Sequence, residues 1–207
     1  MTRIVERFAV GPIVGEAGNT HVRLFGALPQ GTLAAGSKFL WGRIRWRREG
    51  EPQWSDARRF RLNGNFDGSG VVILNDLAPG TRYHYQAGWV PDEEPAELDW
   101  SAASEGSFVT NQPDADQTRF LFGSCCYRFV GFDGKIQDDR ADKIFAEMSD
   151  LSTREKPDFV LFGGDQVYAD SLYNIGAADN REEFSSLYRE SFAQPNLARL
   201  LRETNSY

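Results

Sequence analysis

Residues 159–170 read Phe-Val-Leu-Phe-Gly-Gly-Asp-Gln-Val-Tyr-Ala-Asp, and this stretch decides how the second half of the chain folds. A short apolar run bounded by glycine is typical of a buried strand. The two glycines let the backbone turn sharply where a side chain would clash. Asp165 and Tyr168 therefore stand at the carboxyl end of the predicted strand. Open α/β sheets bind ligands at this edge.

A second predicted strand precedes it, over residues 119–126, and ends in Gly-Ser-Cys-Cys. An apolar helical stripe over 141–151 separates the two strands, so they form a βαβ unit. Parallel strands joined by a helix are often neighbours. Their ends would then present Cys125, Asp165 and Tyr168 to one point. A thiol, a carboxyl and a phenol together suit a highly charged cation, and Fe(III) is the natural partner of a phenolate.

Each of these residues also has a purely structural interpretation. Cys125 could be a small apolar core residue. Asp165 could be a turn or capping residue. Tyr168 could be an amphipathic residue at the sheet edge. The residue pattern alone leaves these interpretations open beside the metal site.

The first 110 residues are predicted to be all-β. Residues 39–47 alternate cleanly, with Leu40, Ile44 and Trp46 on one face and arginines on the other. Further short strands are expected at 22–26, 71–74, 83–85 and 105–110. Such spacing favours a β-sandwich. In residues 77–85 the Leu-x-Pro-x-Thr-x-Tyr-x-Tyr spacing resembles a fibronectin type III domain, in which a tyrosine closes a corner onto the preceding turn.

Polar residues 111–117 carry the best linker signal. We therefore predict a β-sandwich domain over 1–110, a linker over 111–117 and an α/β segment over 118–207. Two more helices are expected, over 182–193 and after Pro195, with Asn196 capping the last. A two-stranded parallel pair is too small for a complete α/β domain. We expect 118–207 to be the opening of a larger domain.

Composition excludes several functional classes. The chain has 207 residues and a net charge of −7, with 23 Lys+Arg against 30 Asp+Glu. Its basic residues concentrate in one alternating set, which is expected to be the solvated face of two strands rather than a nucleic-acid site: Arg43, Arg45, Arg47, Arg48, Arg58, Arg59 and Arg61. The acidic loop 92–95 is likewise expected to be solvated. No apolar run approaches the roughly 20 residues of a membrane span.

The N-terminus does not read as a signal peptide, which as it stands indicates a cytoplasmic location, but a leader removed beforehand would leave the same sequence, so the localisation stays unknown. The two cysteines, Cys125 and Cys126, are adjacent, and neighbours cannot form an ordinary disulfide. Only two histidines are present, His21 and His84, and both lie in the predicted sandwich, where a structural role is expected.

The strings Phe122-Gly123-Ser124-Cys125 and Pro157 to Asp170, with Gly-Asp-Gln-x-Tyr-Ala-Asp, resemble the alkaline phosphatase D (PhoD-like) family of calcineurin-like metallophosphoesterases. That family places a β-sandwich before its catalytic domain. The resemblance implies an immunoglobulin- or fibronectin-III-like sandwich followed by the first βαβ part of an αββα metallophosphatase domain. It also implies a phosphomonoesterase or phosphodiesterase activity on phosphate esters.

The resemblance further implies a dinuclear Fe(III) and Ca²⁺ centre. Cys125 and Tyr168 would bind Fe(III), and Asp165 would bridge the two metals, which lie about 3.5–4 Å apart in such centres. The Gly-Ser-Cys alignment selects Cys125 over Cys126. Asp170 matches the motif without a direct role. The family's later Asp-Asp-His-Glu-like segment and downstream His and Asp ligands are absent, so the second metal lacks ligands and we expect this chain alone to have little phosphatase activity.

Two alternatives differ in class. A non-catalytic β-sandwich binding module with a vestigial α/β segment would leave only residues 1–110 resistant to protease. A cysteine-dependent phosphatase needs Cys-x5-Arg, but Gly131 and Phe132 occupy the arginine positions, so it is rejected. No Walker-type phosphate loop is present either.

Overall fold

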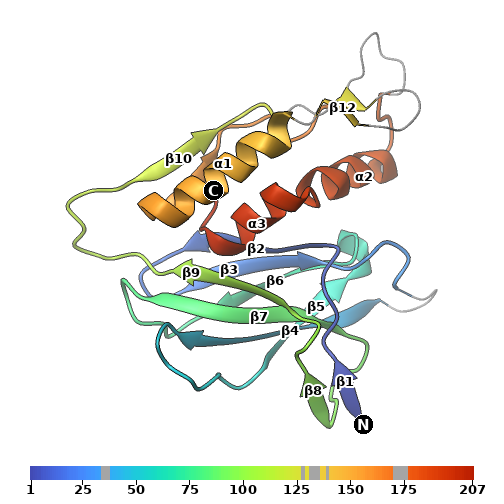
Figure 1. The fold of residues 1–207 in the computed structure, drawn as a ribbon. Coiled ribbons are helices and arrows are strands. Elements are labelled where there is room, and N and C mark those ends of the chain that lie inside the picture. The colour runs from blue at the N-terminus through green and yellow to red at the C-terminus, as the bar shows by residue number, and fades with distance from the viewer. Residues whose placement is uncertain (34–37, 127–128, 131–135, 139, 170–176) are drawn as a thin grey trace.

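The computed structural model describes the chain except residues 34–37, 127–128, 131–135, 139 and 170–176. A β-rich layer structure comes first and a helical part packs above it (Figure 1). The elements are, in order, β1 (Thr2–Ile4), β2 (Val10–Ala17), β3 (Val22–Ala27), β4 (Phe39–Arg48), β5 (Arg58–Asn63), η1 (Gly64–Phe66), β6 (Ser69–Leu74), β7 (Arg82–Val90), β8 (Glu97–Asp99), β9 (Ser104–Val109), β10 (Phe120–Gly123), β11 (Phe129–Val130), β12 (Ile136–Asp138), α1 (Arg140–Glu155), β13 (Phe159–Phe162), α2 (Arg181–Phe192) and α3 (Pro195–Glu203).

Seven strands hydrogen-bond in the order β2-β3-β6-β5-β4-β7-β9. Strands β5 and β6 meet only through the pair Asn63 and Ser69. The sheet therefore divides there into a layer of three strands, β2-β3-β6, and a layer of four, β5-β4-β7-β9. Side chains from both layers share one core, including Leu24 and Leu74 from the first and Ile44 and Phe108 from the second. The predicted β-sandwich is confirmed at this level.

The predicted tyrosine corner is present. The hydroxyl of Tyr83 accepts a hydrogen bond of 2.9 Å from the backbone N–H of Ala78 in the preceding turn. The ring of Tyr83 stacks on Phe108, with 5.2 Å between the ring centroids. The corner thus ties the turn before β7 to the sandwich core.

The expectation of a solvated arginine face is only partly right. Arg43 is buried, and its guanidinium donates to the backbone carbonyls of Asp92 and Glu93. Arg59 pairs with Glu93 and Glu94. The acidic loop is therefore held against the sheet, because its acids and carbonyls find cations within reach. Four of the arginines also lie over aromatic rings of this face, namely Arg45 and Arg47 over Trp54, Arg45 over Trp100, Arg59 over Trp41, and Arg61 over Phe39 and Trp41.

The βαβ unit forms as predicted. Strands β10 and β13 pair in parallel, with Phe120 opposite Phe159 and Gly123 opposite Phe162, and α1 joins them. At the end of the chain Ser206 forms a parallel bridge to Val160, so the segment after α3 adds to the same sheet. The sequence change from all-β to strand–helix–strand falls between β9 and β10. The domain boundaries and the αββα arrangement stay predictions.

Two local predictions about the helices are wrong. The apolar stripe over 141–151 includes Ile144, Phe145, Met148 and Leu151, and it predicts that all four face the core; Ile144 is instead 60% exposed, because Phe145 is the residue that points inward. Asn196 does not cap α3: Gln194 precedes the helix, Pro195 starts it, and the amide of Asn196 instead donates to Asp142 on α1. A proline at the first helical position loses nothing, because its missing N–H would be unpaired there anyway.

Helix α3 joins the two parts of the molecule. It contacts α1 on one side and β2 and β9 of the sandwich on the other (Figure 1). Its residues Leu197, Leu200 and Leu201 are buried, and Ile13 of β2 packs against their cluster. The hydroxyl of Tyr85, inside the sandwich, donates to the carbonyl of Arg202 at 2.9 Å.

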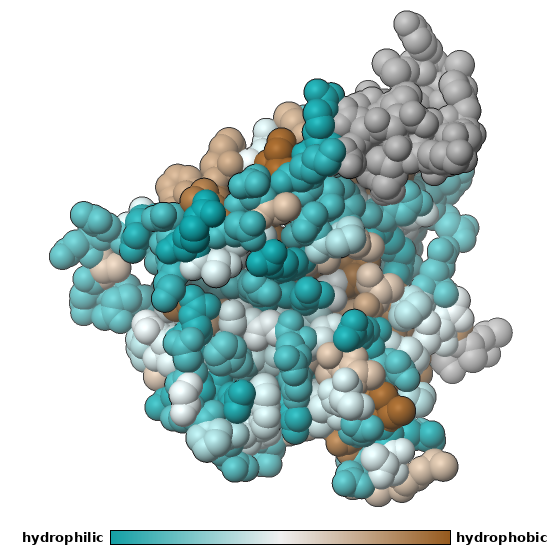
Figure 2. Space-filling model, in the orientation of Figure 1, coloured by the Kyte–Doolittle hydropathy of each residue, from teal (hydrophilic) through white to brown (hydrophobic). Residues whose placement is uncertain are grey.

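One face of the β10–β13 pair is open. The face with Leu121 and Val160 packs in the cluster that includes α1 and α3. On the other face Phe120 and Phe122 are 52% and 63% exposed. Figure 2 shows hydrophobic residues gathering over the region of β10 and α1. Within the described ranges, no helix combines the length and apolar character needed to cross a bilayer.

Candidate metal centre

The two candidate loops are tied together by backbone hydrogen bonds just beyond the paired strands. The N–H of Cys125 donates to the carbonyl of Gly164 at 3.1 Å, and the N–H of Cys126 donates to the carbonyl of Asp165 at 2.8 Å. The parallel ladder thus continues past the ends of β10 and β13. It sets the position of each candidate side chain relative to the other.

Both loops hold a residue in an unusual backbone conformation. Cys125 has φ 61° and Asp165 has φ 53°, and Gly164 between the strand and Asp165 has φ 119°. The left-handed region costs a residue with a Cβ about 1–2 kcal/mol. Such strain persists only where the surroundings impose it, and it concentrates at functional sites. The conformation turns the chain immediately after each strand.

The three candidate side chains converge on one carboxylate oxygen. The Sγ of Cys125 lies 3.4 Å from Oδ2 of Asp165. The hydroxyl of Tyr168 lies 3.3 Å from the same oxygen. Ser124 adds a hydroxyl 3.4 Å from the Cys125 sulfur. Sulfur, carboxylate and phenol oxygens from two loops therefore meet at one point on the surface.

The adjacent cysteines differ in their surroundings. Cys125 is exposed, so the interpretation as a packed core residue does not apply to it. Cys126 is buried in the cluster of α1, α3 and β13, and this burial raises the pKa of its thiol. Of the two sulfurs, Cys125 is the one that faces Asp165.

The neighbours of Tyr168 disfavour ionisation of its phenol. A hydrogen bond with Cys125, some loss of hydration and the charge of Asp165 together raise the pKa of Tyr168 above its ordinary value. Like charges crowded at one site cannot all ionise. A multivalent cation would relieve that crowding and release the protons on binding. The donor set thus fits a cation of high charge, because its thiolate, carboxylate and phenolate ligands would all be anionic.

The rest of a dinuclear centre is not found among the described residues. No group of three His, Cys, Asp or Glu side chains lies close enough to hold a metal there. The two histidines lie in the sandwich, His21 at 3.8 Å from Glu16 and His84 at 3.8 Å from Glu49. Asp170 lies outside the described residues. The described cluster therefore offers one set of ligands, with no histidine beside it.

One contact that supports the loop of Asp165 could not be predicted from the sequence. The hydroxyl of Ser191 on α2 donates to the carbonyl of Gln166 at 3.0 Å, one residue after Asp165. Helix α2 therefore touches the candidate loop directly. A serine near the end of an amphipathic helix carries no signal that would identify such a contact.

No protein-family model matches this chain, and no curated protein matches it. Two solved structures are similar over almost its whole length. One, described as the structure of PhoD, has a TM-score of 0.72, with 16% identity over 98% of this chain and 39% of that one. The other, purple acid phosphatase PPD1 from yellow lupin (Lupinus luteus) seeds, has a TM-score of 0.55, with 13% identity over 95% of this chain and 34% of that one.

The chain thus spans well under half the length of each of these two phosphatase structures. At these identities the similarity shows a shared fold. That fold is the β-sandwich with its adjoining α/β segment, as it occurs in PhoD and in a purple acid phosphatase.

Proposed function

We propose that this chain carries the first ligand cluster of a metal-dependent phosphoester hydrolase of the alkaline phosphatase D type. The observation that supports it most is the convergence of Cys125 and Tyr168 on one oxygen of Asp165, at the shared edge of two parallel strands. The fold shared with two phosphatase structures supports the same reaction class. Phosphate monoesters or diesters would be the substrates.

In this proposal Cys125, Asp165 and Tyr168 would hold Fe(III), and Asp165 would also be a ligand of Ca²⁺. A metal pair of this kind polarises a phosphoryl oxygen and lowers the pKa of bound water. The protein's part is to hold three anionic donors at fixed positions. The left-handed backbone at Cys125 and Asp165 and the hydrogen bonds between their loops provide that rigidity.

The cluster is also accessible. Cys125 and Asp165 are exposed, so a phosphate ester can approach from solvent. No histidine lies beside it to protonate a leaving group, and general acid catalysis typically contributes 10²–10⁴-fold. We therefore expect the 207-residue chain to turn over p-nitrophenyl phosphate or its bis-ester only weakly. Substantial turnover by the purified chain would contradict the assignment of an incomplete site.

Metal binding tests the proposal directly. Titration of the metal-free chain with Fe(III) should produce a visible tyrosinate-to-iron charge-transfer band. Tyr168→Phe should abolish this band. Tyr188→Phe is the matched control, because Tyr188 is a half-exposed tyrosine on α2 that stacks on Phe192. A wild-type chain that takes up no iron at any occupancy would refute the proposed site.

The binding-module alternative finds less support in the packing. In that alternative residues 118–207 are vestigial, yet Val109 and Val14 of the sandwich accept hydrogen bonds from Asn205 and Ser206 at the other end of the chain. Ile13 joins the core cluster of the α/β part. We expect protease to leave both parts resistant. Survival of residues 1–110 alone would favour the binding module.

A further inference from the structure

Helix α2 lies between the sandwich and the candidate ligand loop, but it is not fixed there by a buried apolar face. Ser191 is its only buried residue, and Phe184 and Tyr188 are 42% and 47% exposed. An open, mostly apolar groove of about 320 Å³ separates the helix from β2 and β3, with Ile13 and Phe25 on the sandwich side. Phe192 at the end of the helix packs against the core cluster of Leu197 and Leu200, but apolar packing along the rest of the helix contributes little to its position.

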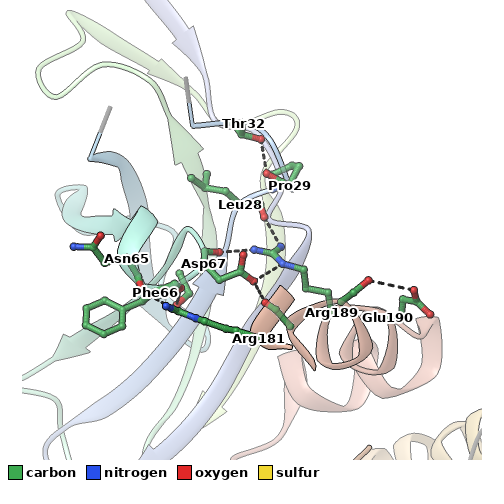
Figure 3. A network of polar contacts seen from close by, with 12 residues as sticks. Leu28, Pro29, Thr32, Asn65, Phe66, Asp67, Arg181, Arg189 and Glu190 are labelled. Carbon is green, nitrogen blue, oxygen red and sulfur yellow. Dashed lines mark hydrogen bonds and ion pairs between the residues drawn. The ribbon is translucent and has the colours of Figure 1, made fainter. Parts of the chain in front are cut away.

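Polar side chains make this connection instead (Figure 3). Arg181, Ser185 and Arg189 follow one another at four-residue spacing, which places them on one face of the helix. Arg181 donates to the carbonyl of Asn65 at 2.7 Å, and Ser185 donates to the carboxylate of Asp67. Both acceptors belong to the turn between β5 and β6.

Arg189 makes the most extensive of these contacts. Its guanidinium donates to Oδ2 of Asp67 at 2.5 Å, to the Asp67 carbonyl, and to the carbonyl of Leu28 at 2.7 Å. Its side chain is only 15% exposed. Asp67 has φ 55°, and the hydrogen bonds of Arg189 and Ser185 outweigh burial and lower its pKa. A planar guanidinium can make such multiple contacts in fixed directions, which a lysine cannot.

A different face of the same helix reaches the ligand loop. Besides the hydrogen bond from Ser191 to Gln166, a small cavity of about 60 Å³ lies between helix and loop. Leu187 and Ser191 line it from α2, and Cys126 and Tyr168 line it from the ligand side. Any movement of α2 would therefore change the surroundings of Tyr168.

We propose that Arg189 and Asp67 form an interdomain latch through which the β-sandwich positions the metal-ligand loop. The latch fixes α2 against the turn at Asp67, and α2 in turn fixes the loop of Asp165 and Tyr168 through Ser191 and Gln166. Arg189 is thus a positioning residue and touches no metal or substrate. The role in metal binding rests on the proposed function, whereas the latch itself can be tested without metal.

The first experiment measures Fe(III) affinity and the charge-transfer band of the full chain. Arg189→Met should weaken affinity about tenfold, the lower end of the range for residues that support metal ligands from behind. Arg189→Lys should show an intermediate loss of Fe(III) affinity, because lysine keeps the positive charge but lacks the planar guanidinium with its several N–H donors. Arg199→Met is the matched control, since Arg199 pairs with Asp150 at 3.3 Å on the α1–α3 side. Far-ultraviolet circular dichroism checks that each variant folds.

A double-mutant cycle separates the latch from general destabilisation. Residues in direct contact show non-additive effects. Asp67→Ala and Arg189→Met together should lower affinity little more than either alone. Additive losses, or an Arg189→Met chain that binds iron as tightly as Arg199→Met, would overturn the positioning role.

The second experiment needs no metal. In a Cys125→Ser background, Cys126 is the one remaining thiol of the sequence, and it lines the cavity under α2. Arg189→Met should increase its labelling rate by a disulfide reagent about tenfold, because local opening exposes it more often. Arg199→Met should leave the rate unchanged. Equal rates in both variants would refute the latch, whereas absence of iron binding in the wild type would refute the proposed metal site.

Discussion

Tyr85→Phe is the most direct test of how the two parts of the chain are joined. The variant removes one hydroxyl, which lies inside the sandwich and donates to the carbonyl of Arg202 in the last turn of α3. Carbonyls in a last helical turn lack intrahelical donors. The N–H of Ser206, four residues further along, donates to the carbonyl of Val14, so it does not donate to the carbonyl of Arg202. The substitution therefore leaves a carbonyl that has lost its donor.

The expected cost follows from this geometry. Tyr85 is 1% exposed, so water cannot easily replace the lost hydroxyl. A neutral hydrogen bond contributes about 0.5–1.5 kcal/mol, and an unsatisfied buried partner costs about 1–3 kcal/mol. We expect the free energy of unfolding to fall by about 1–3 kcal/mol. For a chain of this size each kcal/mol lowers Tm by about 2–4 °C.

Tyr83→Phe is the matched control. Tyr83 lies on the same strand with its hydroxyl bonded inside the sandwich, to Ala78. Both variants should lower stability in urea unfolding. Only Tyr85→Phe should accelerate amide hydrogen exchange in α3 and protease cleavage within residues 118–207. Equal exchange of α3 in the two variants would show that this hydrogen bond does not hold the parts together.

Three further predictions concern the same framework. Gly106→Ala should destabilise the chain more than Tyr85→Phe in urea unfolding, because a Cβ there would stand 2.4 Å from the carbonyl of Arg202; a neutral effect would mean that the helix can move away at no cost. Leu200→Ala removes a fully buried side chain and should cost about 2–5 kcal/mol, measured by chemical denaturation; a loss under about 1 kcal/mol would contradict close packing there. Because the folded state lowers the pKa of Asp67, its ionised form stabilises the fold above its unfolded pKa of about 3.9, and this contribution disappears as pH falls through the lower folded pKa. The difference in stability between wild type and Asp67→Asn should therefore begin to shrink as pH falls below about 4 and reach its minimum only below the lower folded pKa, and a constant difference across pH would exclude this linkage.

Much of the fold follows from local pattern. The alternation over 39–47 predicts β4, and the glycine pair after Phe162 predicts the end of β13. The corner tyrosine Tyr83 is recognisable from its spacing to a proline, since turn chemistry is local. Local pattern fails where a side chain has a choice of partners. Asn196 is of a residue type that often caps helices, but its side chain instead donates to Asp142 on another helix.

The candidate site divides in the same way. Residue types at strand ends single out Cys125, Asp165 and Tyr168, because parallel neighbours bring their carboxyl ends to one edge. Sequence spacing does not reveal which of two adjacent sulfurs faces the carboxylate, since that depends on the left-handed turn at Cys125. The metal-ligand role of the cluster stays a prediction for the iron titration to test.

By itself the sequence determined the two kinds of structure in this chain and the residues at the strand ends, because strand periodicity, glycine turns and parallel pairing act over short separations. Only the tertiary structure decided how those residues are supported. The bond from Tyr85 to Arg202 and the contact of Arg189 with Asp67 join residues more than a hundred positions apart. Such contacts depend on how the sheet layers and the helices pack together, and no local pattern encodes that packing.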